Sequence, residues 1–215
     1  SELKISPVEI IREECEMIIL DALSQSGLGE NLIFKGGTAL RLIYGSPRFS
    51  VDLDFNQKKK VDIKILKKVL IKTAGKINAE LKDLYDKRWT LFALLTVNHP
   101  DLKQAFSVKI EISKKDYGLK QSDYVLKACR SPVIPLTPLI ITYSLERIFK
   151  EKTMAIRTRN ESRDYFDLWY LGQKMDKKVS LPKVKIPESE FKGELSQLLP
   201  DYLKKWPAEF LAGKI

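Results

Sequence analysis

Two acidic residues separated by one apolar residue are the strongest chemical signal in the sequence. Asp52 and Asp54 lie in residues 50–55, where polar and apolar residues alternate strictly. Such alternation predicts a strand with one buried face, so both carboxylates project to the same side, roughly 6.5 to 7 Å apart along the strand. Two ionised carboxylates this close either raise one pKa or recruit a cation, and a divalent metal is the economical answer. The plainer interpretation of an isolated Asp-x-Asp is a solvated surface pair.

Two consecutive glycines provide a candidate phosphate site just before the acidic pair. Gly36, Gly37 and Thr38 follow an expected strand over residues 31–35 and open an expected helix that closes near Gly45. Backbone N–H groups at a helix start favour phosphate, a Cβ could block its close approach, and the Thr38 hydroxyl adds a donor. A tight turn with an N-capping threonine would have the same sequence. The two signals together are more specific than either alone, because one helix and one short loop separate them.

The composition limits both the partners and the chemistry. The 215 residues include 38 Lys and Arg against 28 Asp and Glu, a formal net charge of +10, so the surface should attract polyanions such as nucleotides or nucleic acid. A single histidine, His99, excludes a multi-histidine metal site. Cys15 and Cys129 match no metal-binding or redox spacing, and no run of about 18 apolar residues occurs. We therefore expect a cytoplasmic protein with no membrane partner.

The remaining pattern predicts an α+β fold in which a mixed sheet flanked by helices precedes a helical subdomain. Apolar residues at helical spacing predict a long amphipathic helix over residues 61–86. Alternating or β-rich runs predict strands over residues 89–97, 106–113 and 125–129. From residue 137 the pattern is helical to about residue 158, with a second helix from about residue 163 and a further helical stretch over residues 191–206. We place the domain boundary between residues 1–135 and 136–215.

The glycine and aspartate motifs resemble a known family. Residues 34–40 and 48–55 are similar to the signature of the AbiEii and MenT-type nucleotidyltransferase toxins, which belong to the DNA polymerase β-like nucleotidyltransferase superfamily. The resemblance implies that Asp52 and Asp54 are catalytic metal ligands. It also implies nucleotide binding by the residues of the first motif and by the serine before the acidic pair: Lys35, Gly36, Gly37, Thr38 and Ser50.

A third metal-binding carboxylate is implied by the same resemblance. Members of the superfamily take this ligand from a neighbouring strand, and residues 108–112 have the required order of apolar, charged and apolar residues. Glu111 is therefore the candidate, as a metal ligand and as a catalytic residue. An outward-facing pair of Lys109 and Glu111 on an edge strand is the simpler alternative.

Residues 151–159 and 163–168 resemble the second conserved block of the family. Lys152 and Arg159 are seven residues apart and share a helix face, while Asp164 and Asp167 begin the next helix. The resemblance implies that Lys152 contacts the triphosphate as a catalytic residue, that Arg159 binds the nucleotide, and that Asp167 supports catalysis or positions the lysine. For Asp164 we favour a buried ion pair that fixes the helix corner.

The resemblance, which covers roughly residues 31–170, implies a function. A nucleoside monophosphate would pass from a nucleoside triphosphate to an acceptor, with Mg²⁺ as the cofactor, two ions being expected and Mn²⁺ the alternative. The acceptor would be RNA, at the 3′ end of tRNA, so that translation stops; a cognate antitoxin protein would be a second partner. The lysines of residues 58–60 and of the following helix are candidate phosphate contacts, although such runs are usually solvated.

Three other interpretations remain open at this point. The acceptor could be a small molecule or a protein side chain, because the metal and phosphate chemistry would be the same. The chain could instead be a nucleotide- or RNA-binding module without turnover. A purely structural basic protein would leave the coincidence of the motifs unexplained.

Overall fold

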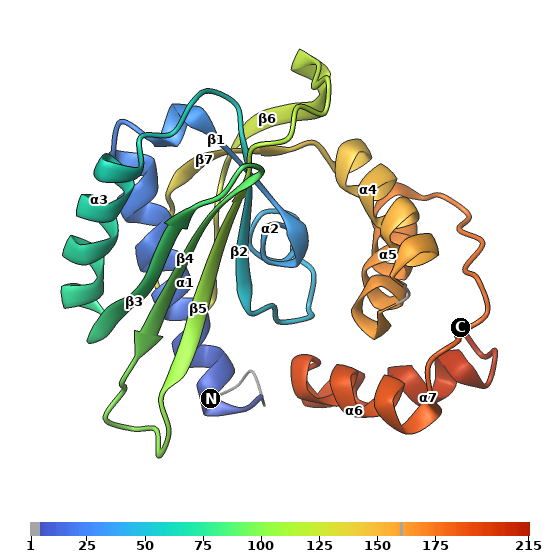
Figure 1. The fold of residues 1–215 in the computed structure, drawn as a ribbon. Coiled ribbons are helices and arrows are strands. Elements are labelled where there is room, and N and C mark those ends of the chain that lie inside the picture. Colours follow the sequence, from blue (N-terminus) through green and yellow to red (C-terminus); the bar gives the residue numbers. More distant parts are fainter. Residues whose placement is uncertain (1–4, 160) are drawn as a thin grey trace.

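A mixed seven-stranded sheet forms the centre of the fold in the computed structural model, which describes residues 5–159 and 161–215 (Figure 1). The strands are β1 (Leu32–Lys35), β2 (Asp52–Gln57), β3 (Ala79–Asp86), β4 (Thr90–Val97), β5 (Phe106–Ser113), β6 (Tyr124–Ala128) and β7 (Leu139–Tyr143). Their order in the sheet is β3-β4-β5-β2-β1-β7-β6. The α-helices are α1 (Pro7–Gln25), α2 (Gly36–Leu42), α3 (Ile63–Lys76), α4 (Leu145–Thr158), α5 (Ser162–Met175), α6 (Glu188–Leu198) and α7 (Trp206–Leu211). The predicted α+β class is confirmed.

Strand β2 occupies the middle of the sheet. It pairs antiparallel with β1 and parallel with β5, and β5 continues antiparallel into β4 and then β3. On the other side, β1 pairs parallel with β7, which is antiparallel to the edge strand β6. The acidic pair is therefore carried by a central strand, where hydrogen bonds on both sides hold the backbone in place.

The two faces of β2 have different surroundings. Leu53 and Phe55 are buried in the main hydrophobic core, which includes apolar residues of α1 and α3. Asp52 and Asp54 alternate with them and point to the opposite face, toward α2. Figure 1 shows α1 and α3 on one side of the sheet, and α2, α4 and α5 on the other.

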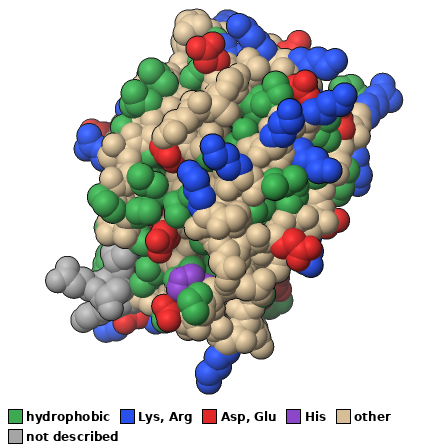
Figure 2. Space-filling view, turned by 90° about the vertical axis from the view of Figure 1, so that its left-hand side faces the viewer, with side chains coloured by type: hydrophobic (Ala, Val, Ile, Leu, Met, Phe, Trp, Pro, Cys, Tyr) green, Lys and Arg blue, Asp and Glu red, His purple; other side chains and the backbone are tan. Residues whose placement is uncertain are grey.

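Helix α3 therefore lies on the face that is opposite to the carboxylates. Its lysines therefore lie on this side, while the candidate phosphate contacts at residues 58–60 follow the end of β2. Figure 2 looks onto the α3 side and shows Lys and Arg side chains gathered in its upper right part, with apolar side chains between them. Lys58 lies over the Tyr124 ring, with 4.9 Å between its Nζ and the ring centroid.

The expectation of one long helix over residues 61–86 was wrong in its second half. Helix α3 ends at Lys76, and β3 follows at Ala79 after Asn78, which has a φ of 48°. A bulge between Leu81 and Asp83 shifts the register of β3. Because of the bulge, Leu81 and Leu84 are both partly buried although they are three residues apart, a spacing that imitates a helix.

The expected helix from residue 137 was also wrong at its start. Residues 139–143 form β7, and α4 begins only at Leu145, where the Ser144 side chain accepts a hydrogen bond from the Arg147 N–H. The run from Leu139 to Tyr143 contains β-branched and aromatic residues, which favour a strand, and Ser144 is a typical N-cap. The sheet thus extends past residue 135, while the division of the chain into two domains there stays a prediction.

The C-terminal helices have a hydrophobic cluster of their own. Its buried members come from α4 to α7 and include Phe166, Phe191 and Trp206. Polar contacts join this cluster to the segment between α2 and β2: the Phe49 N–H donates to the Leu198 carbonyl at 2.8 Å. These contacts fix the position of α4 and α5 relative to β2. Within the described parts of the chain, no helix has the length and apolar character needed to cross a membrane.

A buried glutamate in α1 leads to a stability prediction. Glu16 is 1% exposed and its Oε1 atom has no hydrogen-bond partner. Burial, and then the charge of Glu13, raise the pKa of Glu16 well above the ordinary glutamate value. The folded state therefore disfavours ionised Glu16, and this group makes the protein less stable as the pH rises above about 4.5.

Glu16→Gln is accordingly expected to increase the free energy of unfolding at pH 7 by about 1 to 3 kcal/mol, the usual cost of a buried polar group without a partner. This gain in unfolding free energy should shrink toward zero below pH 4.5, where Glu16 is protonated in both the folded and the unfolded state. Urea denaturation at several pH values measures it, with exposed Glu30→Gln as the control. A variant that is no more stable than the wild type at pH 7 would contradict the assignment of a buried, destabilising charge.

Candidate active site

A cleft of about 730 Å³ opens between the sheet and helices α4 and α5. It is lined by predicted site residues from both halves of the chain, namely Lys35, Gly36, Gly37, Ser50, Asp52, Asp54, Glu111, Lys152 and Arg159. Eight Lys or Arg residues and four Asp or Glu residues are in its lining. The cleft therefore combines an excess of positive charge, suited to a polyphosphate, with a smaller group of carboxylates on its floor.

The three predicted carboxylates lie next to one another on this floor. Asp54 is the register partner of Glu111, and Asp52 is the partner of Lys109, so the side chains of both pairs share the cleft face of the sheet. Burial and then the charge of Asp52 raise the pKa of Asp54. Such crowding of like charges was anticipated from the Asp-x-Asp spacing, and it makes a bound cation favourable.

A lysine ammonium bridges two of these carboxylates. Lys109 Nζ lies 3.2 Å from Asp52 Oδ2 and 3.0 Å from Glu111 Oε2. Lys109 and Glu111 are thus a pair, as the simpler interpretation of this strand expected, but the pair faces the cleft and includes Asp52. The space between the Asp52 and Glu111 carboxylates therefore already holds a positively charged group, the Lys109 ammonium.

Gly36 packs against the acidic pair, and Gly37 packs against the residues just before that pair. Gly36 has a φ of 80°, and a Cβ built there would lie 2.5 Å from Asp54 Oδ2. A Cβ on Gly37 would lie 2.5 Å from Arg48 Nη2 and 2.8 Å from Ser50 Oγ. A side chain at either position would therefore require neighbouring side chains to shift, and the positive φ of Gly36 is a second reason for glycine at that position.

Thr38 has a different position from that expected of a phosphate donor. Its side chain is 1% exposed, and its Oγ1 donates a hydrogen bond to the Asp52 carbonyl at 2.5 Å. In this structure the hydroxyl therefore anchors α2 to the strand that carries the carboxylates, and it does not line the cleft. Lys35, by contrast, lines the cleft, with its Nζ 5.6 Å from the centroid of the Tyr117 ring.

The donor chemistry of the floor suits a divalent metal. Asp52, Asp54 and Glu111 supply the hard oxygen ligands that Mg²⁺ prefers, and Lys109 shows that a positive charge is accommodated among them. Across residues 5–159 and 161–215, no group of three or more His, Cys, Asp or Glu side chains is already arranged to hold a metal ion. The side chains of this floor would therefore have to rearrange for a metal to bind, with the Lys109 ammonium moving aside.

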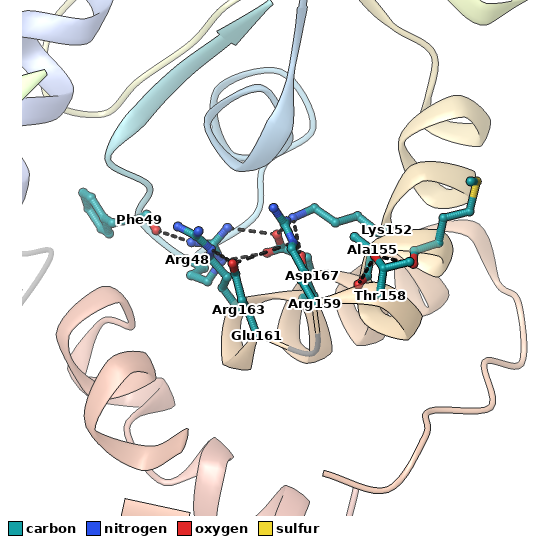
Figure 3. Close-up of polar contacts among 11 residues, drawn as sticks. Arg48, Phe49, Lys152, Ala155, Thr158, Arg159, Glu161, Arg163 and Asp167 are labelled. Atoms are coloured by element: carbon teal, nitrogen blue, oxygen red, sulfur yellow. Dashed lines mark hydrogen bonds and ion pairs between the residues drawn. The ribbon is translucent and has the colours of Figure 1, made fainter. Parts of the chain in front are cut away.

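Lys152 reaches the cleft from α4 and is held by two buried aspartates of α5. Its Nζ lies 3.0 Å from Asp164 Oδ1 and 2.6 Å from Asp167 Oδ2. Arg159 donates to both oxygens of Asp164, at 2.7 and 2.9 Å. Arg48 does the same for Asp167, also at 2.7 and 2.9 Å. Figure 3 shows Arg48 and Lys152 converging on Asp167 from opposite sides.

The surrounding cations keep both aspartates ionised. Burial opposes ionisation of Asp167, but the charges of Arg48 and Lys152 dominate and lower its pKa to about 2. The pKa of Asp164 is also lowered, since burial is outweighed by hydrogen bonds from Arg159 and the charge of Lys152. Both carboxylates are fully buried and neither lines the cleft. Asp164 thus forms buried ion pairs at the helix corner, as expected, and the role of Asp167 in supporting catalysis or positioning Lys152 stays a prediction.

Several cleft residues were not predicted as site residues from the sequence. Lys109 could have been found, because it lies two residues before Glu111 and must share its face. Arg48 begins the second motif, at residues 48–55, but its partner Asp167 is 119 residues away and has no local signal. Lys115, Tyr117 and Arg147 also line the cleft and belong to no motif that the sequence analysis used. Arg163 lines the cleft as well; it lies in the second conserved block but was given no role there.

Comparisons with known proteins indicate the family and the fold of the chain. The family model described as "Nucleotidyl transferase AbiEii toxin, Type IV TA system" matches residues 18–204. The crystal structure of JHP933 from Helicobacter pylori is similar over 98% of this chain and 79% of that chain, with a TM-score of 0.60 and 26% identity. The crystal structure of a putative nucleotidyltransferase from H. pylori covers 98% and 82%, with a TM-score of 0.59 and 25% identity. No curated protein matches the chain.

Proposed function

Because the chain belongs to the AbiEii family of nucleotidyl transferase toxins of type IV toxin–antitoxin systems, we propose that it transfers a nucleoside monophosphate from a nucleoside triphosphate to the 3′ end of an RNA, specifically tRNA. Translation would stop as a result. The observation that supports this reaction best is the cleft itself, where the glycine pair, the acidic pair and Lys152 line one space.

The backbone of the glycine pair and the positive charges of α4 would bind the nucleotide. The close packing of Gly36 and Gly37 on the carboxylate floor leaves no Cβ between their backbone and a phosphate. Lys152 and Arg159 approach from α4 and would neutralise the β and γ phosphates. Asp164 and Asp167 hold Lys152 from behind, so that its ammonium is oriented before the nucleotide binds.

Asp52, Asp54 and Glu111 would hold the divalent metal, Mg²⁺ as two ions or Mn²⁺ in its place, which when bound supplies positive charge to the phosphate oxygens. Glu111, whose side chain is 40% exposed, would accept the proton of the acceptor hydroxyl. The bond from the acceptor oxygen to the α-phosphorus forms as the bond to pyrophosphate breaks.

The position of Lys109 predicts a competition with metal. Lys109→Met removes the ammonium from between Asp52 and Glu111, so that a metal ion no longer has to displace a like charge. We expect the dissociation constant for Mn²⁺, measured by calorimetry on the protein alone, to fall at least about fivefold, which corresponds to about 1 kcal/mol. Exposed Lys82→Met, on β3, is the matched control. Equal Mn²⁺ affinities for wild type and Lys109→Met would contradict this role of the lysine.

Positive charge on the protein favours RNA as the acceptor. RNA is supported by the net charge of +10 and by the excess of positive charge in the cleft. The toxin–antitoxin family implies an antitoxin that silences the protein in the cell.

Incubation with a labelled nucleoside triphosphate and separate pools of tRNA, protein and small metabolites tests the acceptor class. We expect label in the tRNA pool, located at the 3′ terminus by sequencing. Label only in protein or metabolites would overturn the RNA acceptor. Background pyrophosphate release with every pool would favour a binding module without turnover.

A further inference from the structure

An aromatic pair lies beside the carboxylate floor, on a part of the sheet that no motif predicted. The row of register partners that contains Asp54 and Glu111 continues across the sheet to Phe92 on β4 and Tyr85 on β3. Directly paired residues of neighbouring strands share a face, so both rings are on the cleft face. The rings of Tyr85 and Phe92 are stacked, with centroids 4.6 Å apart and planes 7° apart.

This part of the cleft face is uncovered. Among the described residues, the helices that pack closely against β3, β4 and β5 are α1 and α3, and they lie on the opposite face, where Leu91, Ala93 and Leu95 are buried. On the cleft face, the β4 residues are only partly buried and Tyr85 is 37% exposed. Figure 1 shows β3, β4 and β5 in the foreground with α1 behind them. The stacked pair is therefore accessible from solvent.

Cations accompany the exposed aromatic rings around the site. Lys87 Nζ lies 4.5 Å from the Tyr85 ring centroid, and Lys35 Nζ lies 5.6 Å from that of Tyr117, which is 39% exposed and lines the cleft. The nearby acids Glu80 and Asp86 are each paired with a lysine. Exposed aromatic rings with neighbouring cations are the combination that binds single-stranded nucleic acid, with bases on the rings and phosphates at the cations.

The reaction geometry determines which substrate belongs on this side. In an in-line displacement, the acceptor oxygen and the leaving pyrophosphate are on opposite sides of the α-phosphorus. The glycine pair contacts Asp54, and Lys152 approaches from α4, so the triphosphate belongs at that end of the row. The acceptor must then approach from the side of Glu111, which leads to Phe92 and Tyr85.

We propose that the acceptor RNA lies as a single strand across the cleft face of β5, β4 and β3, with its terminal hydroxyl at Glu111 and its preceding bases on Phe92 and Tyr85. This inference rests on the proposed function. Three strand spacings separate Asp54 from Tyr85, about 14 Å, which accommodates about four nucleotides at the 3.4 Å rise of a stacked strand. A small-molecule acceptor would not need contacts this far from the reacting atoms.

The test compares Tyr85→Ala with Tyr85→Phe, which retains the ring, and with Lys87→Ala. The probe is a short single-stranded RNA with a free 3′ hydroxyl, whose binding is followed by fluorescence anisotropy and whose extension gives KM and kcat. Tyr85→Ala should weaken binding and raise the KM for RNA by about 5- to 150-fold, with Tyr85→Phe close to wild type. Affinity for a fluorescent nucleotide analogue should not change.

Ile71→Ala is the matched control, because Ile71 is 53% exposed on α3, on the opposite face of the molecule. If wild type and Tyr85→Ala bound RNA equally and had the same KM while transfer to RNA remained intact, the proposed RNA-binding surface would be refuted. The proposed function would still stand in that case. Transfer by the wild type to protein or metabolites alone would overturn both the RNA acceptor and its surface. Loss of nucleotide-analogue affinity in Tyr85→Ala would also count against the proposal, because it would place the ring at the nucleotide.

Discussion

Replacing Asp54 by asparagine is expected to abolish nucleotide transfer while leaving the fold at least as stable as the wild type. Asparagine keeps the shape of the side chain but removes the charge that would hold a divalent metal, whose contribution to the transition state amounts to several kcal/mol. A loss of about 4 kcal/mol corresponds to a rate reduced about 10³-fold. Because burial and the charge of Asp52 already raise the pKa of Asp54, the neutral amide also removes a repulsion from the folded state.

The combination of the two effects makes this variant informative. Transfer of label to RNA and the midpoint of thermal unfolding are measured on the same preparation. Glu80→Gln provides the control, since Glu80 is an exposed carboxylate on β3 that pairs with Lys82 and should have no effect on transfer. A stable Asp54→Asn protein with wild-type activity would contradict the metal role, and a protein that unfolds would show that Asp54 is needed for the fold.

Asp167→Ala is expected to destabilise the protein by about 3 to 5 kcal/mol, because it leaves two buried cations without their partner. Asp167 is 0% exposed, and it is contacted by Arg48, which is 2% exposed, and by Lys152. The pair with Arg48 also joins α5 to the segment before β2, so its loss frees the C-terminal helices from the cleft. Urea denaturation measures the change.

The same carboxylate predicts a pH dependence. The pKa of Asp167 in the folded protein is about 2, below the ordinary aspartate value of 3.8. Its contribution to stability is therefore complete above pH 3.8 and is lost as the pH falls through about 2. The difference in free energy of unfolding between wild type and Asp167→Asn should therefore narrow as the pH falls from 3.8 to about 2. Asp201→Asn, which breaks an exposed ion pair with Lys204, is the control and should lower the free energy of unfolding by at most about 1 kcal/mol. If Asp167→Asn lowered the free energy of unfolding by no more than Asp201→Asn does, the buried network would be refuted.

The parts of the site that were predictable from the sequence depend on local geometry. Asp52 and Asp54 share a face because residues two apart on a strand must do so, and Gly36 and Gly37 begin α2, the helix that precedes this strand. Lys152 and Asp167 were predicted from a family resemblance and the spacing of two consecutive helices. In each case a few neighbouring residues contain the information.

The parts that could not be predicted depend on long-range pairing. No local pattern shows that Arg48 contacts Asp167, or that Tyr85 is placed in one row with Glu111. The β3 bulge gives Leu81 and Leu84 a helical spacing, so local periodicity was misleading there. The strand at residues 139–143 was overlooked because the α4 pattern follows after one residue, although Ser144 marks the start of the helix.

The most direct test of nucleotide transfer at the carboxylate floor uses one nucleoside triphosphate labelled in turn at the α and γ phosphates. The protein is incubated with each label, tRNA and Mg²⁺, and the RNA is then separated and counted. We expect the α label in RNA and the γ label in free pyrophosphate, with both signals absent for Asp54→Asn. Incorporation of the γ label would show phosphoryl transfer instead, and α incorporation that persists in Asp54→Asn would remove the carboxylate from the reaction.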